Sequence, residues 1–206
     1  MESRLIEGFM VLVLFLGYLT LWKIKKRNML RTNGDDPEVI YNDSRPTQKF
    51  FGNLSRLLSV SIGLLIVIHS LGVKNIAAFH QMELLDNVTV DFIGLLFGLG
   101  GLTLCRQAQQ EMGRSWRVGI DRQNKTALVT TGVFRKIRNP TYSGLFMICT
   151  GTLMIFPTMS LLVWVMVFCI AIEFQVRIEE EFLTDTHGEQ YIRYHQTTKR
   201  YIPLFY

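Results

Sequence analysis

The chain has 206 residues, of which 49% are hydrophobic and 19% are charged, and its formal net charge at pH 7 is +5. This length suits one domain, and the composition on its own would fit a soluble protein. The distribution of residues excludes a soluble protein, because the apolar ones form long blocks almost free of charge. A nucleic-acid-binding protein is also disfavoured, since the basic residues lie in the gaps between blocks rather than on a folded basic surface.

Five apolar blocks predict an all-α integral membrane protein with about five transmembrane helices. In chain order they cover residues 6–22, 57–73, 90–105, 142–156 and 160–174. These lengths approach the roughly 20 residues that a helix needs to cross a bilayer. A basic cluster follows the first block rather than preceding it, which indicates an uncleaved helix and not a signal peptide. The last two blocks are separated only by a short linker with Pro157, so we expect a C-terminal helical hairpin.

The third block contains the sequence FGLGGL, whose small residues Gly98, Gly100 and Gly101 predict close packing against another helix. A nucleotide-binding loop is excluded there, because no strand precedes these glycines and no phosphate-binding loop could lie at membrane depth. The oligomeric state stays open, since the same glycine-rich face would permit a dimer.

The basic residues predict the orientation of the chain in the membrane. Of the 22 Lys and Arg residues, 8 lie in residues 23–56, 8 in 106–141 and 4 in 177–206. With five crossings these three segments share one side, and only Arg4 and Lys74 fall on the other. By the positive-inside rule the shared side, with the C-terminus, is cytoplasmic and the N-terminus is outside.

The loop before the fourth block, residues 114–142, is the most informative stretch of the sequence. Gly132 suits a turn with positive φ, and Asn139 and Pro140 predict an N-cap and the first residue of a helix. One interpretation is that these residues only begin a transmembrane helix, with the nearby Arg138 binding lipid headgroups. The other interpretation is a ligand site beside the membrane.

A second polar group of residues, RIEEE at 177–181, lies where the fifth block leaves the membrane. Glu179 and Glu180 project about 100° apart on a helix, so at least one should turn toward the protein. The pair could form an exposed helix end, or one carboxylate could close a polar cavity. In the second case Arg138 and Arg177 would neutralise it or position an anionic substrate group.

The tail and the remaining chemistry-bearing residues give weaker signals. The amphipathic tail from His187 onward would pack back over the loop, with tyrosines at the membrane interface. Three cysteines form no CxxC pair and are expected to be small buried residues. His187 and His195 have no metal-ligand spacing, so no metal site is predicted.

Taken together, the loop, the acidic pair and the tail resemble the isoprenylcysteine carboxyl methyltransferase family and its relatives, the phospholipid methyltransferases and small prokaryotic membrane methyltransferases. The resemblance covers residues 113–203. Its landmarks are GRSW at 113–116, ALVTTGVF at 127–134, RNPTY at 138–142, EEEFL at 179–183, HGEQYIRY at 187–194 and RYIP at 200–203. Each landmark is weak, but the ordered set around a helical hairpin is specific.

The resemblance implies a methyltransferase that uses S-adenosylmethionine at the cytoplasmic interface and takes a lipidic substrate from the bilayer. Catalytic or substrate-positioning roles fall to Arg138 and Arg177. The cofactor-binding positions that the resemblance implies are Thr126, Ala127, Leu128, Val129, Phe134, Asn139, Pro140, Tyr142, Glu179 and Glu180.

Three positions depart from the family pattern. Asn139 replaces the usual histidine, and Phe134 replaces the usual tyrosine. Gln175 stands where the isoprenylcysteine enzymes have the arginine that orients the substrate carboxylate, and Arg177 lies two residues later. The acceptor therefore stays open between an isoprenylcysteine-like carboxylate, a phospholipid amine, a small thiol and another lipid.

We expect one structural domain with two parts. Residues 1–112 would form the N-terminal transmembrane helices on the substrate side, and residues 113–206 would form the cofactor loop, the hairpin and the tail. Two alternatives stay open. A membrane reductase of the sterol reductase type, dependent on NADPH, has a similar C-terminal arrangement but generally needs more spans. A non-enzymatic membrane scaffold would need none of the site residues beyond their part in stability.

Overall fold

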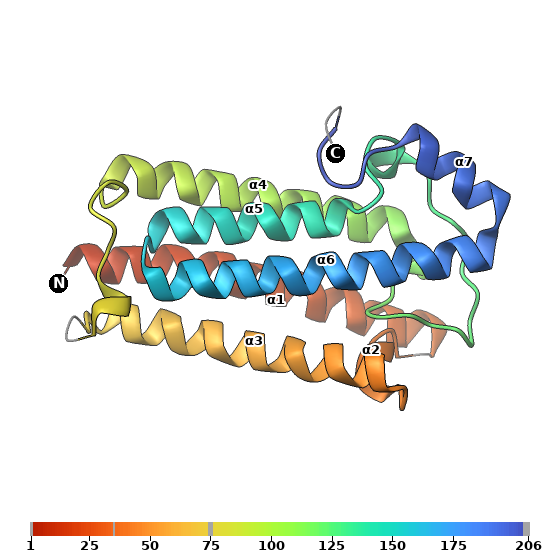
Figure 1. Cartoon of the computed structure of the whole chain (residues 1–206), viewed down its shortest axis with the longest axis horizontal. Coiled ribbons are helices and arrows are strands. Elements are labelled where there is room, and N and C mark those ends of the chain that lie inside the picture. Colours follow the sequence, from red (N-terminus) through yellow and green to blue (C-terminus); the bar gives the residue numbers. More distant parts are fainter. Residues whose placement is uncertain (1, 35, 74–75, 204–206) are drawn as a thin grey trace.

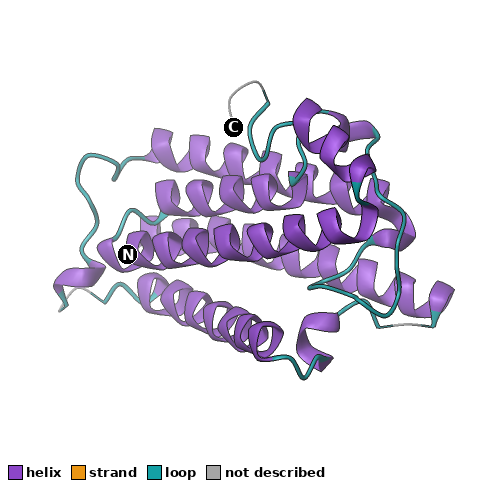
Figure 2. Ribbon diagram, turned by 45° about the vertical axis from the view of Figure 1, so that its right-hand side comes forward, coloured by secondary structure: helices purple, strands orange, loops and turns teal. Residues whose placement is uncertain are grey.

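The computed structural model describes residues 2–34, 36–73 and 76–203, and over these ranges the protein is helical, with no strand (Figures 1 and 2). The long helices lie side by side in one bundle. They are α1 (Glu2–Asn33), α3 (Pro46–Ser70), α4 (Val88–Met112), α5 (Pro140–Ile155) and α6 (Met159–His187). Shorter elements are α2 (Val39–Asn42), α7 (Glu189–Thr197) and the 3₁₀ helices η1 (Ala77–Phe79), η2 (Gly113–Ser115) and η3 (Gly132–Arg135).

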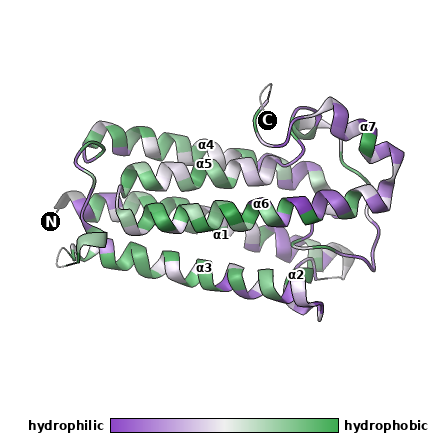
Figure 3. Cartoon of the chain, in the orientation of Figure 1, coloured by the Kyte–Doolittle hydropathy of each residue, from purple (hydrophilic) through white to green (hydrophobic). Residues whose placement is uncertain are grey.

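The helices confirm the predicted all-α membrane fold. Within the described ranges, four are long and apolar enough to cross a membrane: Arg4–Thr32, Pro46–Ser70, Val88–Ser115 and Met159–His187. Many large apolar side chains are exposed, such as Phe9 at 66% and Val60 at 63%. The long helices are largely hydrophobic along their length (Figure 3). Helix α5 has 16 residues, about 24 Å at 1.5 Å per residue, so a fifth crossing stays a prediction.

Three helices, α1, α3 and α6, extend well beyond the apolar blocks that predicted them. Helix α6 begins with Thr158 as N-cap, whose side chain accepts a hydrogen bond from the Leu161 N–H, and continues to His187. Its last turns are hydrophilic (Figure 3). Helix α3 begins at Pro46, well before its apolar block at 57–73, whereas α5 begins at Pro140 as predicted. The α5–α6 pair forms the expected hairpin around Pro157.

The loops gather at the two ends of the bundle, and the basic segments share one of them. Helix α2, the segment between α4 and α5, and the tail with α7 lie together, away from the start of α1 (Figure 1). We call this the tail end, and the other the opposite end. The predicted five crossings require the three basic segments to lie at the same end of the bundle, as they do. Lys74, predicted on the other side, lies outside the described residues.

Helices α4 and α5 pack with their backbones in near contact. Gly94, Gly98 and Gly101 form a buried stripe on α4. A Cβ at Gly101 would lie 2.5 Å from the Gly144 carbonyl oxygen, and one at Gly94 would lie 2.7 Å from that of Gly151. The close packing predicted from the glycines is confirmed. Their stripe is covered by α5 and, at Gly98, by Leu14 of α1, so it is not a free dimer face.

The core lies between all five long helices. It contains Val11 and Leu14 of α1, Ile62 and Ile66 of α3, Cys105 of α4, Ile148 and Ile155 of α5, and Leu161 of α6. The cysteines are free, and Cys105 and Cys149 are buried as expected.

A polar cluster is buried in the opposite end of the bundle. The Glu7 Oε2 atom lies 2.7 Å from His69 Nε2 and accepts a hydrogen bond of 3.0 Å from the Gln81 side chain. Arg4 Nη2 donates a hydrogen bond of 2.6 Å to the Gln81 amide oxygen, Oε1. The His69 ring stacks on Phe156 with 3.6 Å between centroids. This cluster ties α1, α3 and the α3–α4 loop together.

Candidate functional site

Two cavities of about 250 Å³ each lie beside the tail-end segments. The first, which we call the polar cavity, is enclosed by the segment between α4 and α5, the start of α5, and the last turns of α6. Its wall includes Gln109, Trp116, Asp121, Thr126, Ala127, Leu128, Val129, Phe134, Arg138, Asn139, Pro140, Tyr142, Glu179, Tyr191 and Tyr194. The structure therefore brings nearly all predicted cofactor positions to one cavity.

The loop over this cavity is fixed at Asp121. Its carboxylate accepts hydrogen bonds from the Gln123 and Asn124 N–H groups, both at 3.0 Å, and from Arg117 Nε at 3.2 Å. Burial disfavours the charged form of Asp121, but the bonds from Asn124, Arg117 and Gln123 outweigh it and hold its pKa below the ordinary value. The Asp121 carboxylate therefore organises residues 117–124 as one folded loop.

The N-terminal half of the chain holds the same loop from the other side. The Ile40 N–H donates to the Val118 carbonyl at 2.9 Å, and the Gln48 side chain donates to the Ile120 carbonyl at 2.9 Å. Gly119 has φ +88°, and a Cβ there would lie 2.7 Å from that of Ile40. Glycine is needed at 119 for both its conformation and this contact.

Glu111 at the end of α4 positions the short helix η3. Its carboxylate accepts from the Val133 N–H at 2.7 Å. The same carboxylate occupies the space that a Cβ on Gly132 would take, and Gly132 has φ +57°, as its predicted turn required. The buried Phe134 side chain then lines the polar cavity. The tail packs over this turn as expected, with the Tyr194 hydroxyl donating to the Phe134 carbonyl at 2.7 Å.

Glu179 presents a carboxylate to the polar cavity. Its Oε1 atom accepts two hydrogen bonds of 2.8 Å, one from the Tyr142 hydroxyl and one from the Gln175 amide. Its Oε2 atom has no hydrogen-bond partner among the residues that the structure describes. One oxygen therefore fixes the orientation of the group, and the other is available to a ligand.

Glu180 lies behind the cavity wall and binds the tail. Its Oε1 accepts from Arg138 Nε at 3.1 Å and from the Asn139 amide at 3.0 Å, and its Oε2 accepts from Arg200 at 2.8 Å. Arg138 also donates to the carbonyls of His195 and Thr198. Asn139 takes the predicted N-cap position, but its side chain makes no cap bond because Glu180 binds it. Glu180 itself is not part of either cavity wall.

The structure does not bring Arg177 to the site, contrary to the role predicted for it. Its side chain is 59% exposed and pairs with Glu173 at 2.8 Å. Arg177 lies two residues before Glu179, about 200° around the helix, so it points away. Gln175, one turn before Glu179, occupies the inner face instead. Two other arginines reach the acidic pair, both through Glu180: Arg138, and Arg200 of the RYIP landmark, for which no role was predicted.

Gln109 is a site residue that the sequence reasoning missed. Its side chain is 4% exposed and lines the polar cavity. Its Nε2 atom is buried without a hydrogen-bond partner, which is rare because an unpaired buried donor is costly. A signal was present in the sequence, since Gln109 continues the helical stripe of Gly101 and Cys105 with a polar residue.

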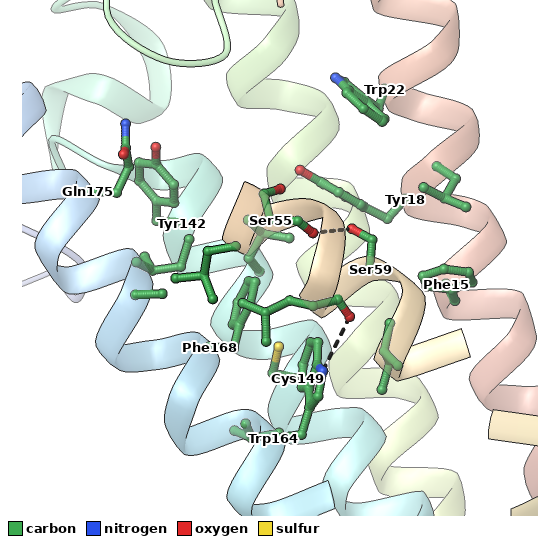
Figure 4. Close-up of a pocket in the computed structure, with 18 of the residues that line it drawn as sticks. Phe15, Tyr18, Trp22, Ser55, Ser59, Tyr142, Cys149, Trp164, Phe168 and Gln175 are labelled. Atoms are coloured by element: carbon green, nitrogen blue, oxygen red, sulfur yellow. Dashed lines mark hydrogen bonds between the residues drawn. The ribbon is translucent and has the colours of Figure 1, made fainter. Parts of the chain in front are cut away.

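The second cavity, which we call the apolar cavity, lies between α1, α3, α5 and α6 (Figure 4). Its wall includes Phe15, Leu58, Trp164 and Phe168, and none of the residues that line it is charged. Five residues line both cavities: Tyr18, Val118, Gly119, Tyr142 and Leu145. Tyr142 and Gln175, the two partners of Glu179, also lie together at one end of the apolar cavity (Figure 4).

Comparison with known proteins identifies similar sequences and a similar fold. The family model described as phospholipid methyltransferase matches residues 90–190, a stretch that includes most of α4. Two relatives, each called probable protein-S-isoprenylcysteine O-methyltransferase, come from Oryza sativa subsp. indica and subsp. japonica. Each is 28% identical over 125 residues, which cover 59% of this chain and 65% of the relative.

A solved structure of the eukaryotic intramembrane Ras methyltransferase, isoprenylcysteine carboxyl methyltransferase, has the same fold. It aligns with a TM-score of 0.52 at 20% identity, over 79% of this chain and 54% of that one. The chain thus spans about 65% of the plant relatives and about half of the solved protein. The match over residues 90–190, the plant relatives and the shared fold together support an isoprenylcysteine carboxyl methyltransferase-like and phospholipid methyltransferase-like family of integral membrane proteins for this chain.

Proposed function

We propose that this chain is a membrane-embedded methyltransferase that uses S-adenosylmethionine and acts on a lipidic or lipid-linked acceptor. The observation that carries the proposal is the pair of cavities of opposite character with five wall residues in common. Transfer of a methyl group from a polar donor to a lipid requires both molecules to meet at one point while their remaining parts stay in different surroundings. The wall around Tyr142 offers such a point.

The residues of the polar cavity fit S-adenosylmethionine. The free Oε2 atom of Glu179 suits a cationic group, and the orphan Gln109 amide nitrogen would donate to an oxygen or nitrogen of the ligand. Phe134 and Trp116 provide aromatic surface, which is favourable beside a sulfonium or against a purine. Residues 126–129 would hold the cofactor along its length. When bound, it supplies a methyl group already activated on sulfur.

The protein's own contribution is positioning and the exclusion of water. Alignment of two reactants and removal of solvent account for much of the rate enhancement in reactions of this kind. Tyr142 and Gln175 fix the Glu179 carboxylate, and Glu180 with Arg138 fixes the tail over η3. A carboxylate or thiolate acceptor needs no general base, whereas an amine must arrive neutral.

The charges around the site support an acceptor whose head group is uncharged at transfer. The apolar cavity has no basic residue in its wall, Arg177 points away, and Arg138 is bound to Glu180 and the tail. A buried carboxylate without a cationic partner would cost several kcal/mol. These contacts favour a phospholipid-like amine over an isoprenylcysteine-like carboxylate. The comparisons likewise favour a methyltransferase over the reductase alternative.

We also propose that the tail end faces the cytoplasm and the N-terminus lies outside. The three segments with 20 of the 22 Lys and Arg residues supply the argument. Accessibility labelling of single cysteines at the two ends, in sealed vesicles, would test this orientation independently of activity.

The direct test is calorimetric titration of S-adenosylmethionine into detergent-purified protein. Glu179→Gln keeps the size of the side chain and removes its charge, and we expect affinity to fall about tenfold, as for a charge-assisted contact. Glu181→Gln is the matched control, because Glu181 is the neighbouring carboxylate and is exposed. Absence of binding to folded wild-type protein would refute the proposal. Heat protection by NADPH alone would favour the reductase.

A further inference from the structure

The wall shared by the two cavities contains few side chains that can form hydrogen bonds. Of its five residues, Val118, Gly119 and Leu145 have no polar side-chain atom. The Tyr142 hydroxyl is already committed to Glu179 at 2.8 Å. Tyr142 can still accept a hydrogen bond, but Tyr18 is the one shared wall residue whose hydroxyl is open both to donate to and to accept from a polar group of an incoming molecule.

Tyr18 is held toward the interior by the packing of α1. It lies on the same helical face as Val11 and Leu14, which are 1% and 0% exposed. Its side chain extends from α1 into the space where Ser55 and Tyr142 also lie (Figure 4). Among the residues that the structure describes, none forms a hydrogen bond with the Tyr18 hydroxyl. Tyrosine hydroxyls in such surroundings usually have a partner.

We propose that the Tyr18 hydroxyl binds the head group of the methyl acceptor where the two cavities adjoin, and so positions the nucleophile. This inference rests on the proposed function. A phenol hydroxyl can accept a hydrogen bond from an amine N–H, and the nitrogen lone pair then stays free. The apolar tail of the acceptor would lie along Phe15, Phe168 and Trp164. The N-terminal half would thereby contribute acceptor recognition.

The test is Tyr18→Phe, which removes only the hydroxyl. Methyl transfer from radiolabelled S-adenosylmethionine is measured in mixed micelles with dioleoylphosphatidylethanolamine and, separately, with N-acetyl-S-farnesylcysteine. We expect kcat/KM for the acceptor to fall about tenfold, the effect of one hydrogen bond, and cofactor Kd to change less than about twofold. Tyr41→Phe is the matched control, since Tyr41 lines the apolar cavity alone and pairs with Ser55 at 3.2 Å.

A loss in Tyr18→Phe no larger than that in Tyr41→Phe would overturn the assignment. If neither lipid is methylated by wild-type protein, photo-crosslinking decides. Benzoylphenylalanine placed at position 18 should capture radiolabelled phosphatidylethanolamine saturably, whereas placed at the exposed Leu16 it should capture lipid without saturation. No saturable capture at position 18 would refute the inference. Failure of wild-type protein to bind S-adenosylmethionine would instead refute the proposed function.

Discussion

The two ends of the helix bundle both bury charged side chains, but they use them differently. At the opposite end, Glu7 is 4% exposed and binds His69 and Gln81, and none of these three residues lines the polar or the apolar cavity. At the tail end, Glu180 is bound on both oxygens, whereas its neighbour Glu179 keeps one oxygen free on a cavity wall.

This difference in hydrogen-bond satisfaction distinguishes a structural cluster from a binding site. Buried polar groups that satisfy one another stabilise the fold and need nothing else. At the tail end, by contrast, the buried Gln109 amide nitrogen and the second carboxylate oxygen of Glu179 have no partner among the described residues and belong to residues of the same cavity wall, where a ligand would bind them. An unpaired group alone is not sufficient, because the buried Arg4 Nη1 also has no partner among the residues that the structure describes, and Arg4 lines neither cavity.

The largest effect is expected from Glu180→Ala. Removal of this carboxylate takes away the ion pair of the largely buried Arg138 and one of the ion pairs of Arg200, which keeps Glu173, and we expect a cost of about 3–5 kcal/mol. The tail should detach, so α7 becomes sensitive to limited proteolysis while the hairpin stays resistant. Unfolding in mild detergent would give the stability change. An unchanged proteolysis pattern would show that Glu180 does not hold the tail.

Glu7→Gln tests whether the opposite end is structural. The substitution weakens the bond to the buried His69, and we expect a loss of stability of about 1–3 kcal/mol. The affinity for S-adenosylmethionine should stay at the wild-type value, because Glu7 lines neither cavity. Thermal unfolding and calorimetric titration measure the two quantities. A change in affinity without a change in stability would show that the opposite end is not a purely structural cluster.

Gln109→Met should raise the stability of the protein and lower its affinity for the cofactor. Methionine fills a similar volume and removes the unpaired amide, so the ligand-free protein should gain about 1 kcal/mol. The same change should weaken the binding of S-adenosylmethionine, because the cofactor would lose the hydrogen-bond donor that the Gln109 amide provides. Melting temperatures with and without the cofactor report both effects. Gln110→Met, at the exposed neighbouring position, is the control.

The smallest effect concerns pH and the loop at Asp121. The pKa of Asp121 in the folded protein is below its ordinary value of 3.8, so its contribution to stability is complete above that value. It is lost as the pH falls through the lower folded pKa. Hydrogen exchange of residues 117–124 should therefore show protection that is constant from about pH 7 to about pH 5 and declines only in stronger acid. In Asp121→Asn this acid-dependent step should disappear.

The sequence predicted the helices well because hydropathy reports which segments lie in the membrane. It missed the length of α6 because hydropathy ends where the membrane ends, whereas the helix continues through the polar residues to His187. The helical geometry that sets Glu179 and Glu180 about 100° apart also places Gln175, and not Arg177, one turn before Glu179, so the site role predicted for Arg177 conflicts with that geometry. The order of motifs sufficed to bring residues 126–142 and Glu179 together.

Contacts across long separations were beyond prediction. Arg200 reaches Glu180 only because the chain reverses at Gly188, where φ is +53°, and returns through α7. The apolar cavity depends on how α1 and α3 diverge from α5 and α6, and no local pattern encodes that arrangement. Tyr18 has no distinguishing neighbours in the sequence, so its place on the shared wall is visible only in three dimensions.

The near contact of α4 and α5 has a consequence for distant substitutions. Cys105 lies on the same seam as Gly101 and donates to the Thr141 carbonyl at 3.4 Å, next to Tyr142. A methyl group at Gly94 or Gly101, deep in the apolar part of the bundle, would force the two backbones apart. The displacement would reach Tyr142 and change its distance from Gln109. Inherited or engineered variants at these glycines should therefore change the shape of the polar cavity without touching any residue of its wall.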